Sequence, residues 1–267
     1  MAEAQLTAPR SSRLNWCIRL LGTAFGFVSF GVGGLIFTAL IVPYIWLRHQ
    51  NERARGVALR RAISRAFLMH VNALRAFGVL DYTISDRSRF AVTSTSDRII
   101  VANHPSLMDV VFLVAFVENA VCVVKDSLFR NFYIGFAIRM AGYVSNKDPD
   151  TLIVSCKEAL ERGEKIIIFP EGTRSTPGER ARLQRGSAYV ALACGIEPTP
   201  VRITAKPSSL TKGLPWYSIP PSKMVFHFDV GEPIAVADLQ TMERGLAARR
   251  LNRRIAQEIF RSSSEEG

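Results

Sequence analysis

The stretch RIIVANHPSLMDVVFLV, residues 98–114, joins an apolar run, a short polar turn and a second apolar run. RIIVAN (98–103) has the β-branched residues of a buried strand, and we expect a helix to follow over 106–119. Pro105 suits the first turn of that helix, and Ser106 suits its cap. This stretch therefore predicts a strand that passes almost directly into a helix.

The alternation of strands and helices continues along the chain, with glycines at 142, 163 and 195 placed where helices end. We expect further strands over 121–125, 165–169, 199–204 and 223–230, and further helices over 127–141, 150–163, 185–195 and from 239 onwards. Residues 205–222, rich in Pro, Ser and Gly, predict a long surface loop. The alternation predicts an α/β fold with a largely parallel central sheet flanked by helices.

The chain carries no charge between Leu20 and Leu47. A helix of this length would be roughly 42 Å long, which exceeds the roughly 30 Å hydrocarbon core of a bilayer. Five glycines and Pro43 disfavour a uniform helix, so both a bent spanning helix and an immersed hairpin are compatible with the sequence. Arginines concentrate on the C-terminal side, which predicts the inner membrane with the rest of the chain in the cytoplasm.

Residues 56–78 have the pattern of an amphipathic helix, with an apolar stripe formed by Leu59, Ile63, Phe67, Val71 and Leu74. Its arginines, among them Arg60, either meet lipid phosphates or are solvated while the stripe packs on the following domain. We expect residues 1–80 to anchor the chain in a membrane and residues 81–267 to form one α/β domain.

The formal net charge of +11 predicts an acidic partner surface, either nucleic acid or an anionic membrane. The arginines cluster beside apolar segments and no nucleic-acid-binding motif is present, so a membrane is favoured and nucleic acid is not expected. The four cysteines have no paired spacing, which argues against a metal site or a disulfide framework.

His104 and Asp109 lie near a strand end, where a carboxylate can fix an imidazole tautomer and leave the other nitrogen free to accept a proton. On its own, such a pair is more typical of a structural histidine beside a helix cap. The chain has no GxSxG elbow, so a Ser-His-Asp hydrolase is not supported.

KIIIFPEGTRSTPG (165–178) places Glu171, Gly172 and Arg174 directly after another strand, and ligands collect at the carboxyl ends of strands in α/β folds. Arg174 offers a planar fork suited to phosphate, and Gly172 lets the backbone approach a ligand closely. Glu171 is suited to hold a hydroxyl or to pair with the arginine. The two stretches therefore predict one edge of the sheet that carries both a general base, His104, and an anion-binding residue, Arg174, which we call the anion clamp.

NHPSLMD (103–109) resembles the NHx4D motif of the glycerophosphate and lysophospholipid acyltransferases, and FPEGTRS (169–175) resembles their second signature. The segment 125–142 is similar to the family's lysine-led segment, and PTPVRIT (198–204) is similar to its proline-containing strand. The resemblance covers about residues 95–235, and the N-terminal helices resemble those of bacterial 1-acylglycerol-3-phosphate acyltransferases.

This resemblance implies that His104 is a general base oriented by Asp109, which activates the acceptor hydroxyl for attack on an acyl thioester of CoA or acyl carrier protein. It implies an acyltransferase domain over 81–267, lysophosphatidate as acceptor and phosphatidate as product. It also implies that no metal, cofactor or acyl-enzyme is needed. The residues it implies for substrate binding are Asn103, Lys125, Glu171, Gly172, Thr173, Arg174 and Lys147.

The chain departs from the family in three places. The arginine common after Gly142 is absent, so Lys147 is the nearest cation and cannot make a bidentate phosphate contact. Glu197 stands where proline is common, and 210–221 adds a loop that resembles those of relatives in aryl polyene-type lipid pathways. Another lysolipid or a specialised lipid therefore stays open as acceptor. A non-catalytic basic membrane-binding module is the alternative of another class, and the intact motif residues argue against it.

Overall fold

The computed structural model describes residues 13–91, 97–132, 134–175, 182–211 and 215–261. Within them, seven strands form one sheet in the order β1-β7-β6-β2-β5-β3-β4. The strands are β1 (Leu80–Ile84), β2 (Ile99–Ala102), β3 (Ala120–Val124), β4 (Val144–Ser145), β5 (Lys165–Ile168), β6 (Pro198–Lys206) and β7 (Met224–Val230). Neighbouring strands are parallel except β6 and β7, which are antiparallel. The largely parallel α/β sheet predicted from the sequence is confirmed, and β1 and β4 are additions to it.

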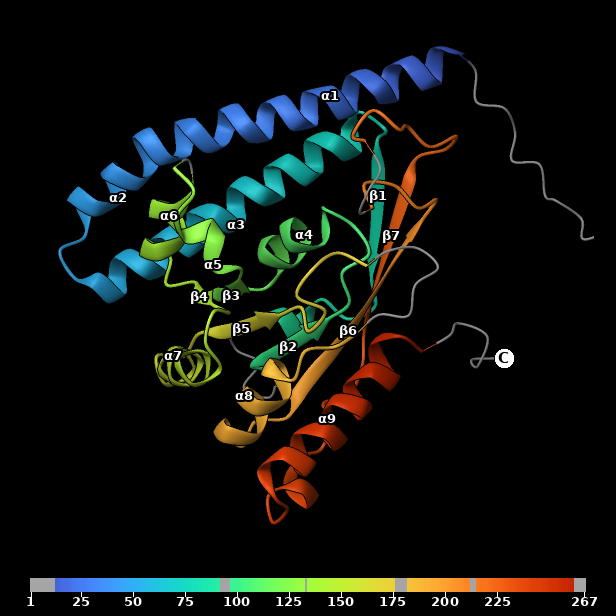
Figure 1. The fold of residues 1–267 in the computed structure, drawn as a ribbon. Helices are drawn as coiled ribbons and strands as arrows, with labels where there is room; N and C mark the ends of the chain where they lie inside the picture. The colour runs from blue at the N-terminus through green and yellow to red at the C-terminus, as the bar shows by residue number, and fades with distance from the viewer. Residues whose placement is uncertain (1–12, 92–96, 133, 176–181, 212–214, 262–267) are drawn as a thin grey trace, which may run out of the picture.

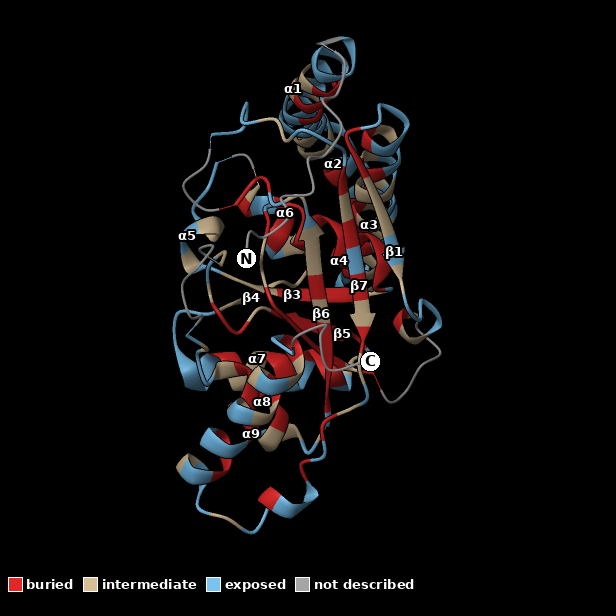
Figure 2. Ribbon diagram, turned by 90° about the vertical axis from the view of Figure 1, so that its right-hand side faces the viewer, coloured by how far each residue is buried: buried red, intermediate tan, exposed pale blue. Residues whose placement is uncertain are grey.

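Helices cover both faces of the sheet (Figure 1). Strand residues alternate between two apolar cores, as Ile100 and Ala102 lie in one while Ile99 and Val101 lie in the other. The first core also contains residues of α3 (Glu52–Ala76) and α4 (Asp109–Phe116). The second contains residues of α7 (Pro149–Glu161), α8 (Gly186–Cys194) and α9 (Arg244–Ile259). The central strands β2 and β5 are fully buried between these layers, whereas the edge strand β1 is partly exposed (Figure 2), and this burial explains the continuous apolar runs of the central strands.

Glycine decides where several helices end or break. Gly142, Gly163 and Gly195 have φ of 75°, 82° and 64°, so the three predicted helix ends are confirmed. The single helix expected over 127–141 is wrong: the chain forms α5 (Asp126–Phe129) and α6 (Gly135–Met140) instead. At Gly135 the chain closes so tightly that a Cβ would lie 2.4 Å from the carbonyl oxygen of Phe129.

The N-terminal apolar segment is a helix from Leu14 to Arg48, long and apolar enough to cross a membrane by length and composition. It comprises α1 (Arg13–Ile36), a π turn at Phe37–Ile41 and α2 (Val42–Arg48). The π turn ends two residues before Pro43, whose ring and missing N–H disturb the regular hydrogen-bond ladder. The glycines do not interrupt the helix, and no hairpin forms within it. Most of its apolar side chains are exposed.

Helix α3 packs its apolar stripe on the sheet domain, as the second of the two interpretations proposes. Leu59, Ile63, Val71 and Leu74 are buried, and α3 contacts α4. Arg60 follows neither interpretation, because it is only 5% exposed and its Nη2 lies 2.6 Å from Glu164 Oε1. The expectation of a lipid-facing or solvated Arg60 is therefore wrong: a buried carboxylate requires a charged partner there.

The segment that follows β6 contacts α1 and is only partly a surface loop. Ser209, Leu210 and Thr211 are buried, which corrects the expectation of a solvent-exposed 205–222 segment. The apolar side chain of Leu210 is buried beneath α1, beside Val79 and Met224. Residues 212–214 of the segment lie outside the described residues.

Candidate active site

The two motifs meet at one edge of the sheet because their strands are neighbours. β2 and β5 are parallel, with Val101 opposite Ile168, so both strands end at the same level. The turn that contains His104 follows β2, and the turn that contains Glu171 follows β5. β6 is parallel to β2 on its other side, so the segment after β6 starts at the same edge.

His104 and Asp109 form a direct side-chain contact. His104 Nδ1 lies 2.9 Å from Asp109 Oδ2, and the aspartate is fully buried. The carboxylate also accepts hydrogen bonds from the Ser106 N–H at 2.6 Å and the Ser106 hydroxyl at 2.9 Å. Burial raises the pKa of Asp109 above its ordinary value, while the hydrogen bonds from His104 and Ser106 oppose the rise. Asp109 thus holds the imidazole and also closes the turn before α4.

The imidazole of His104 packs against an aromatic ring and is largely buried. Its ring centroid lies 4.6 Å from that of Phe169, and its side chain is 15% exposed. Among the described residues, Nε2 has no hydrogen-bond partner. With Nδ1 directed at the carboxylate, Nε2 is the nitrogen available to accept a proton.

Glu171 joins the second motif to the main chain of the first. Its Oε1 accepts a hydrogen bond from the backbone N–H of His104 at 2.8 Å, and Ser175 Oγ donates to Oε2, also at 2.8 Å. The Ser175 N–H donates to the His104 carbonyl oxygen, again at 2.8 Å. Glu171 is buried and forms no ion pair with Arg174 in the described part of the chain. It therefore fixes the backbone of the histidine.

Arg174 lies beside the segment that follows β6. Its Nη1 donates to the Leu210 carbonyl oxygen at 3.1 Å and lies 3.5 Å from that of Thr211. Its other N–H groups have no partner among the residues that the structure describes. Gly172, with φ of 65°, forms the left-handed turn that brings Arg174 back toward His104, and Thr173 is exposed.

Three other residues expected to bind substrate lie at the same edge but apart from the motif contacts. The Asn103 side chain bonds both backbone groups of Ile203, at 2.8 and 2.7 Å, and thereby ties β2 to β6. This geometry does not support the expectation that Asn103 contacts substrate, because its amide is turned into the sheet. Lys125 and Lys147 follow β3 and β4 and are exposed, without an ion pair to the motif residues in the described ranges.

The structure adds Ser175 and Leu210 to the residues around the site. Ser175 is the last residue of FPEGTRS, and its hydroxyl was the available signal in the sequence. Leu210 accepts the hydrogen bond from Arg174 with its backbone oxygen, and no side-chain pattern in the sequence predicts such a contact. No group of three or more His, Cys, Asp or Glu side chains that could hold a metal ion occurs in the described residues.

Comparisons with known proteins agree with this architecture. A family model described as Acyltransferase matches residues 84–204. A 1-acyl-sn-glycerol-3-phosphate acyltransferase of Helicobacter pylori is 30% identical over 148 residues, 53% of this chain and 56% of that protein. The chloroplastic 1-acyl-sn-glycerol-3-phosphate acyltransferase LPAT1 of Arabidopsis thaliana is 30% identical over 116 residues, 42% of this chain and 33% of that protein. The matched part thus spans between a third and just over half of these relatives.

A crystal structure of the 1-acyl-sn-glycerophosphate acyltransferase PlsC from Thermotoga maritima has the same fold. Its TM-score is 0.65 at 21% identity, and the match covers 91% of this chain and 98% of that chain. The family match includes both NHPSLMD and FPEGTRS, whose side chains the sheet brings together. Residues 84–204 of the chain therefore match the acyltransferase family, and the fold agrees with that match.

Proposed function

We propose that the chain is a membrane-bound O-acyltransferase that moves an acyl chain from acyl-CoA or acyl carrier protein to the free hydroxyl of 1-acylglycerol-3-phosphate, giving phosphatidate. The observation that carries the proposal is the 2.9 Å contact between His104 and a fully buried Asp109, at the edge where Arg174 also lies. The curated relatives named as 1-acyl-sn-glycerol-3-phosphate acyltransferases support the same acceptor.

In the proposed reaction, Nε2 of His104 takes the proton of the acceptor hydroxyl while its oxygen attacks the thioester carbonyl. The carboxylate of Asp109 stabilises the imidazolium that forms. Collapse of the tetrahedral intermediate breaks the carbon–sulfur bond, and the proton passes from the imidazolium to the leaving thiolate. The products are the new ester and the free thiol, and the balance requires no cofactor or acyl-enzyme.

The other motif residues would hold the reactants in line, which supplies much of the acceleration in such transfers. Arg174 presents a planar guanidinium to the acceptor phosphate, and Gly172 and Thr173 shape the turn beside it. Lys125 and Lys147 add positive charge at the ends of β3 and β4, where phosphates of either substrate can approach. Glu171 keeps the histidine backbone in place.

The helix from Leu14 to Arg48 would seat the protein in the inner membrane, with the catalytic domain on the cytoplasmic side. The arginines that follow it favour this orientation under the positive-inside rule. We place the boundary between anchor and acyltransferase domain near residue 80, where α3 gives way to β1. Lysophosphatidate, itself a membrane lipid, would reach the site from the adjoining leaflet.

Two departures from the family pattern favour a second acceptor. The missing arginine after Gly142 and the added segment 210–221 fit another lysolipid or an aryl polyene-type lipid. This alternative retains the same base and the same thioester chemistry.

The test is a screen of the purified protein in membranes, with lysophosphatidate and other lysolipids as acceptors, and acyl-CoA and acyl carrier protein as donors. We expect phosphatidate from the parent chain and none from His104→Ala. The matched control is His227→Ala, because His227 is exposed on β7. Product from His104→Ala contradicts the mechanism. Turnover of another acceptor in place of lysophosphatidate supports the alternative, and no turnover of any acceptor favours a non-catalytic module.

A further inference from the structure

The carbonyl oxygen of Leu210 contacts both signature motifs. It accepts a hydrogen bond from the backbone N–H of Leu107 at 3.2 Å and another from Arg174 Nη1 at 3.1 Å. Leu107 belongs to NHPSLMD and Arg174 to FPEGTRS. A single backbone oxygen from the segment after β6 thus joins the turn that carries the base to the residue that carries the anion clamp.

The backbone of Leu210 has an unusual conformation. Its φ is 55°, in the left-handed region that a leucine rarely adopts. Conformations of this kind persist where the surroundings determine them, and they gather at functional sites. The left-handed turn directs the carbonyl oxygen at the two motif donors.

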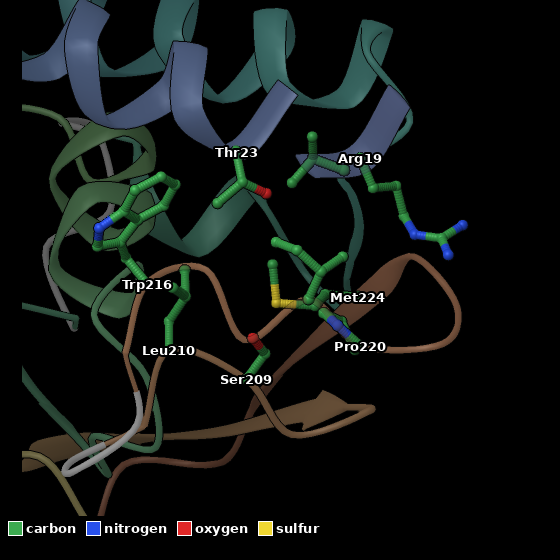
Figure 3. Close-up of a pocket in the computed structure, with 9 residues that line it drawn as sticks. Arg19, Thr23, Ser209, Leu210, Trp216, Pro220 and Met224 are labelled. Carbon is green, nitrogen blue, oxygen red and sulfur yellow. The ribbon is translucent and has the colours of Figure 1, made fainter. Parts of the chain in front are cut away.

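The packing of the Leu210 side chain holds the backbone in this left-handed conformation. It is 8% exposed and lines a small pocket with Thr23 of α1, Val79, Trp216 and Met224. Figure 3 shows Leu210 and Trp216 beside one another beneath α1.

Two further contacts hold the rest of the segment against the same helix. The ring of Trp216 lies 5.7 Å from that of Phe27, and Arg19 Nη2 donates to the Pro221 carbonyl oxygen at 2.9 Å. Trp216 and Pro221 therefore lie against α1, Leu210 lines the pocket beneath the same helix, and the Leu210 backbone contacts both motifs.

We propose that Leu210 is a positioning residue for the acyl acceptor: packed beneath α1, it holds its carbonyl oxygen where it orients the guanidinium of Arg174. This inference rests on the proposed function and deepens it, since it adds Leu210, from the segment that follows β6, to the acceptor site. The Leu210 oxygen engages Nη1 alone. The remaining N–H groups of the guanidinium keep their orientation for a phosphate monoester.

The acceptor phosphate makes such a clamp necessary. A guanidinium binds phosphate best through two parallel N–H groups, and this geometry fails when the plane of the fork rotates. Arg174 has no carboxylate partner within the described residues to fix that plane. The Leu210 and Thr211 carbonyl oxygens are the acceptors that fix it.

The experiment measures steady-state kinetics of the full chain in lipid vesicles for Leu210→Ala, Arg174→Ala and the double variant. Leu210→Ala keeps the carbonyl oxygen but removes the side chain that positions it. The hydrogen bond to the charged guanidinium is then lost or misdirected, so KM for lysophosphatidate should rise about tenfold, with kcat and the donor KM within about twofold. In the Arg174→Ala background, Leu210→Ala should add no further rise, because it acts through that arginine. Leu210→Met keeps an apolar side chain in the pocket and should restore the parent KM.

Leu152→Ala is the matched control, because Leu152 is equally buried but lies in the core on the other face of the sheet. It should lower stability without a selective change in the acceptor KM. An unchanged acceptor KM in Leu210→Ala, or independent effects in the double variant, overturns the inference alone. Absence of lysophosphatidate turnover by the parent chain overturns the proposed function and this inference with it.

Discussion

The backbone N–H of His104 donates to Glu171 Oε1 over 2.8 Å, so the second signature motif holds the first by its main chain. Ser175 completes the link, because its own N–H donates to the His104 carbonyl oxygen. The carboxylate of Glu171 is thus engaged with the protein, and in the proposed reaction it would contribute to turnover through the histidine.

Glu171→Gln should lower kcat about tenfold and leave the acceptor KM within about twofold, since the amide keeps one oxygen acceptor but loses the charge. Steady-state assays across acceptor concentrations separate the two parameters. Glu232→Gln is the control, because Glu232 is exposed and away from the motifs. A selective rise in the acceptor KM would instead assign Glu171 to substrate contact.

Asp109→Asn should lower kcat by about three to four orders of magnitude, as for other triad-type histidines whose carboxylate is replaced by an amide. The amide cannot stabilise the imidazolium that forms when the acceptor hydroxyl is deprotonated. Circular dichroism checks the fold, since Asp109 also closes the turn before α4. Ser106→Ala, which leaves the carboxylate in place, should lose less. An asparagine variant with more than a tenth of the parent kcat would remove Asp109 from the mechanism.

Arg60→Ala should destabilise the protein by about 3–5 kcal/mol, because it leaves Glu164 buried without its closest cation. The alanine also removes hydrogen bonds to Ala141 and Asn119. Thermal unfolding in detergent measures the change. Arg61→Ala on the exposed side of the same helix should stay within about 0.5 kcal/mol of the parent. Equal unfolding temperatures for the two variants would show that the buried pair contributes little.

Cys122 and Cys156 should resist alkylation in the folded protein. Burial raises the pKa of each thiol to about 12, so at pH 8 about one thiol in ten thousand is the reactive thiolate. Labelling should increase only as the pH approaches 12 or after unfolding. Peptide mass spectrometry after iodoacetamide treatment distinguishes these sites from the exposed Cys17. Rapid labelling of Cys122 at pH 8 would mean that the first core opens readily.

The sequence predicts most of the sheet because buried parallel strands are long apolar runs, and Gly142, Gly163 and Gly195 mark helix ends by a conformation that only glycine adopts easily. Apolar runs do not predict β1 and β4. β1 mixes Asp81 and Thr83 with apolar residues at the sheet edge, and β4 has only two residues. Their pairing is set by partners distant in sequence, which no local pattern encodes.

The same limit applies to the candidate site. His104 and Asp109 are five positions apart in a recognisable motif, so their contact follows from a single turn. Glu171 is recognisable too, but its attachment to the His104 backbone depends on how two turns pack. Leu210 is identified only in three dimensions, because its contribution is a carbonyl oxygen and a left-handed backbone.

The contact between Arg19 and Pro221 joins residues 202 positions apart. Most of the synthesis of the chain therefore takes place between the addition of these two residues. At about 5–20 residues per second, the apolar N-terminal helix emerges roughly 10–40 s before the segment that covers its inner side. During that interval the helix has only lipid or a chaperone to shield it. NHPSLMD and FPEGTRS can meet as soon as β2 and β5 pair, whereas the support for Arg174 waits for β6 and the loop beyond it. The Arg174 side of the candidate site is therefore the last to be completed as the protein is made.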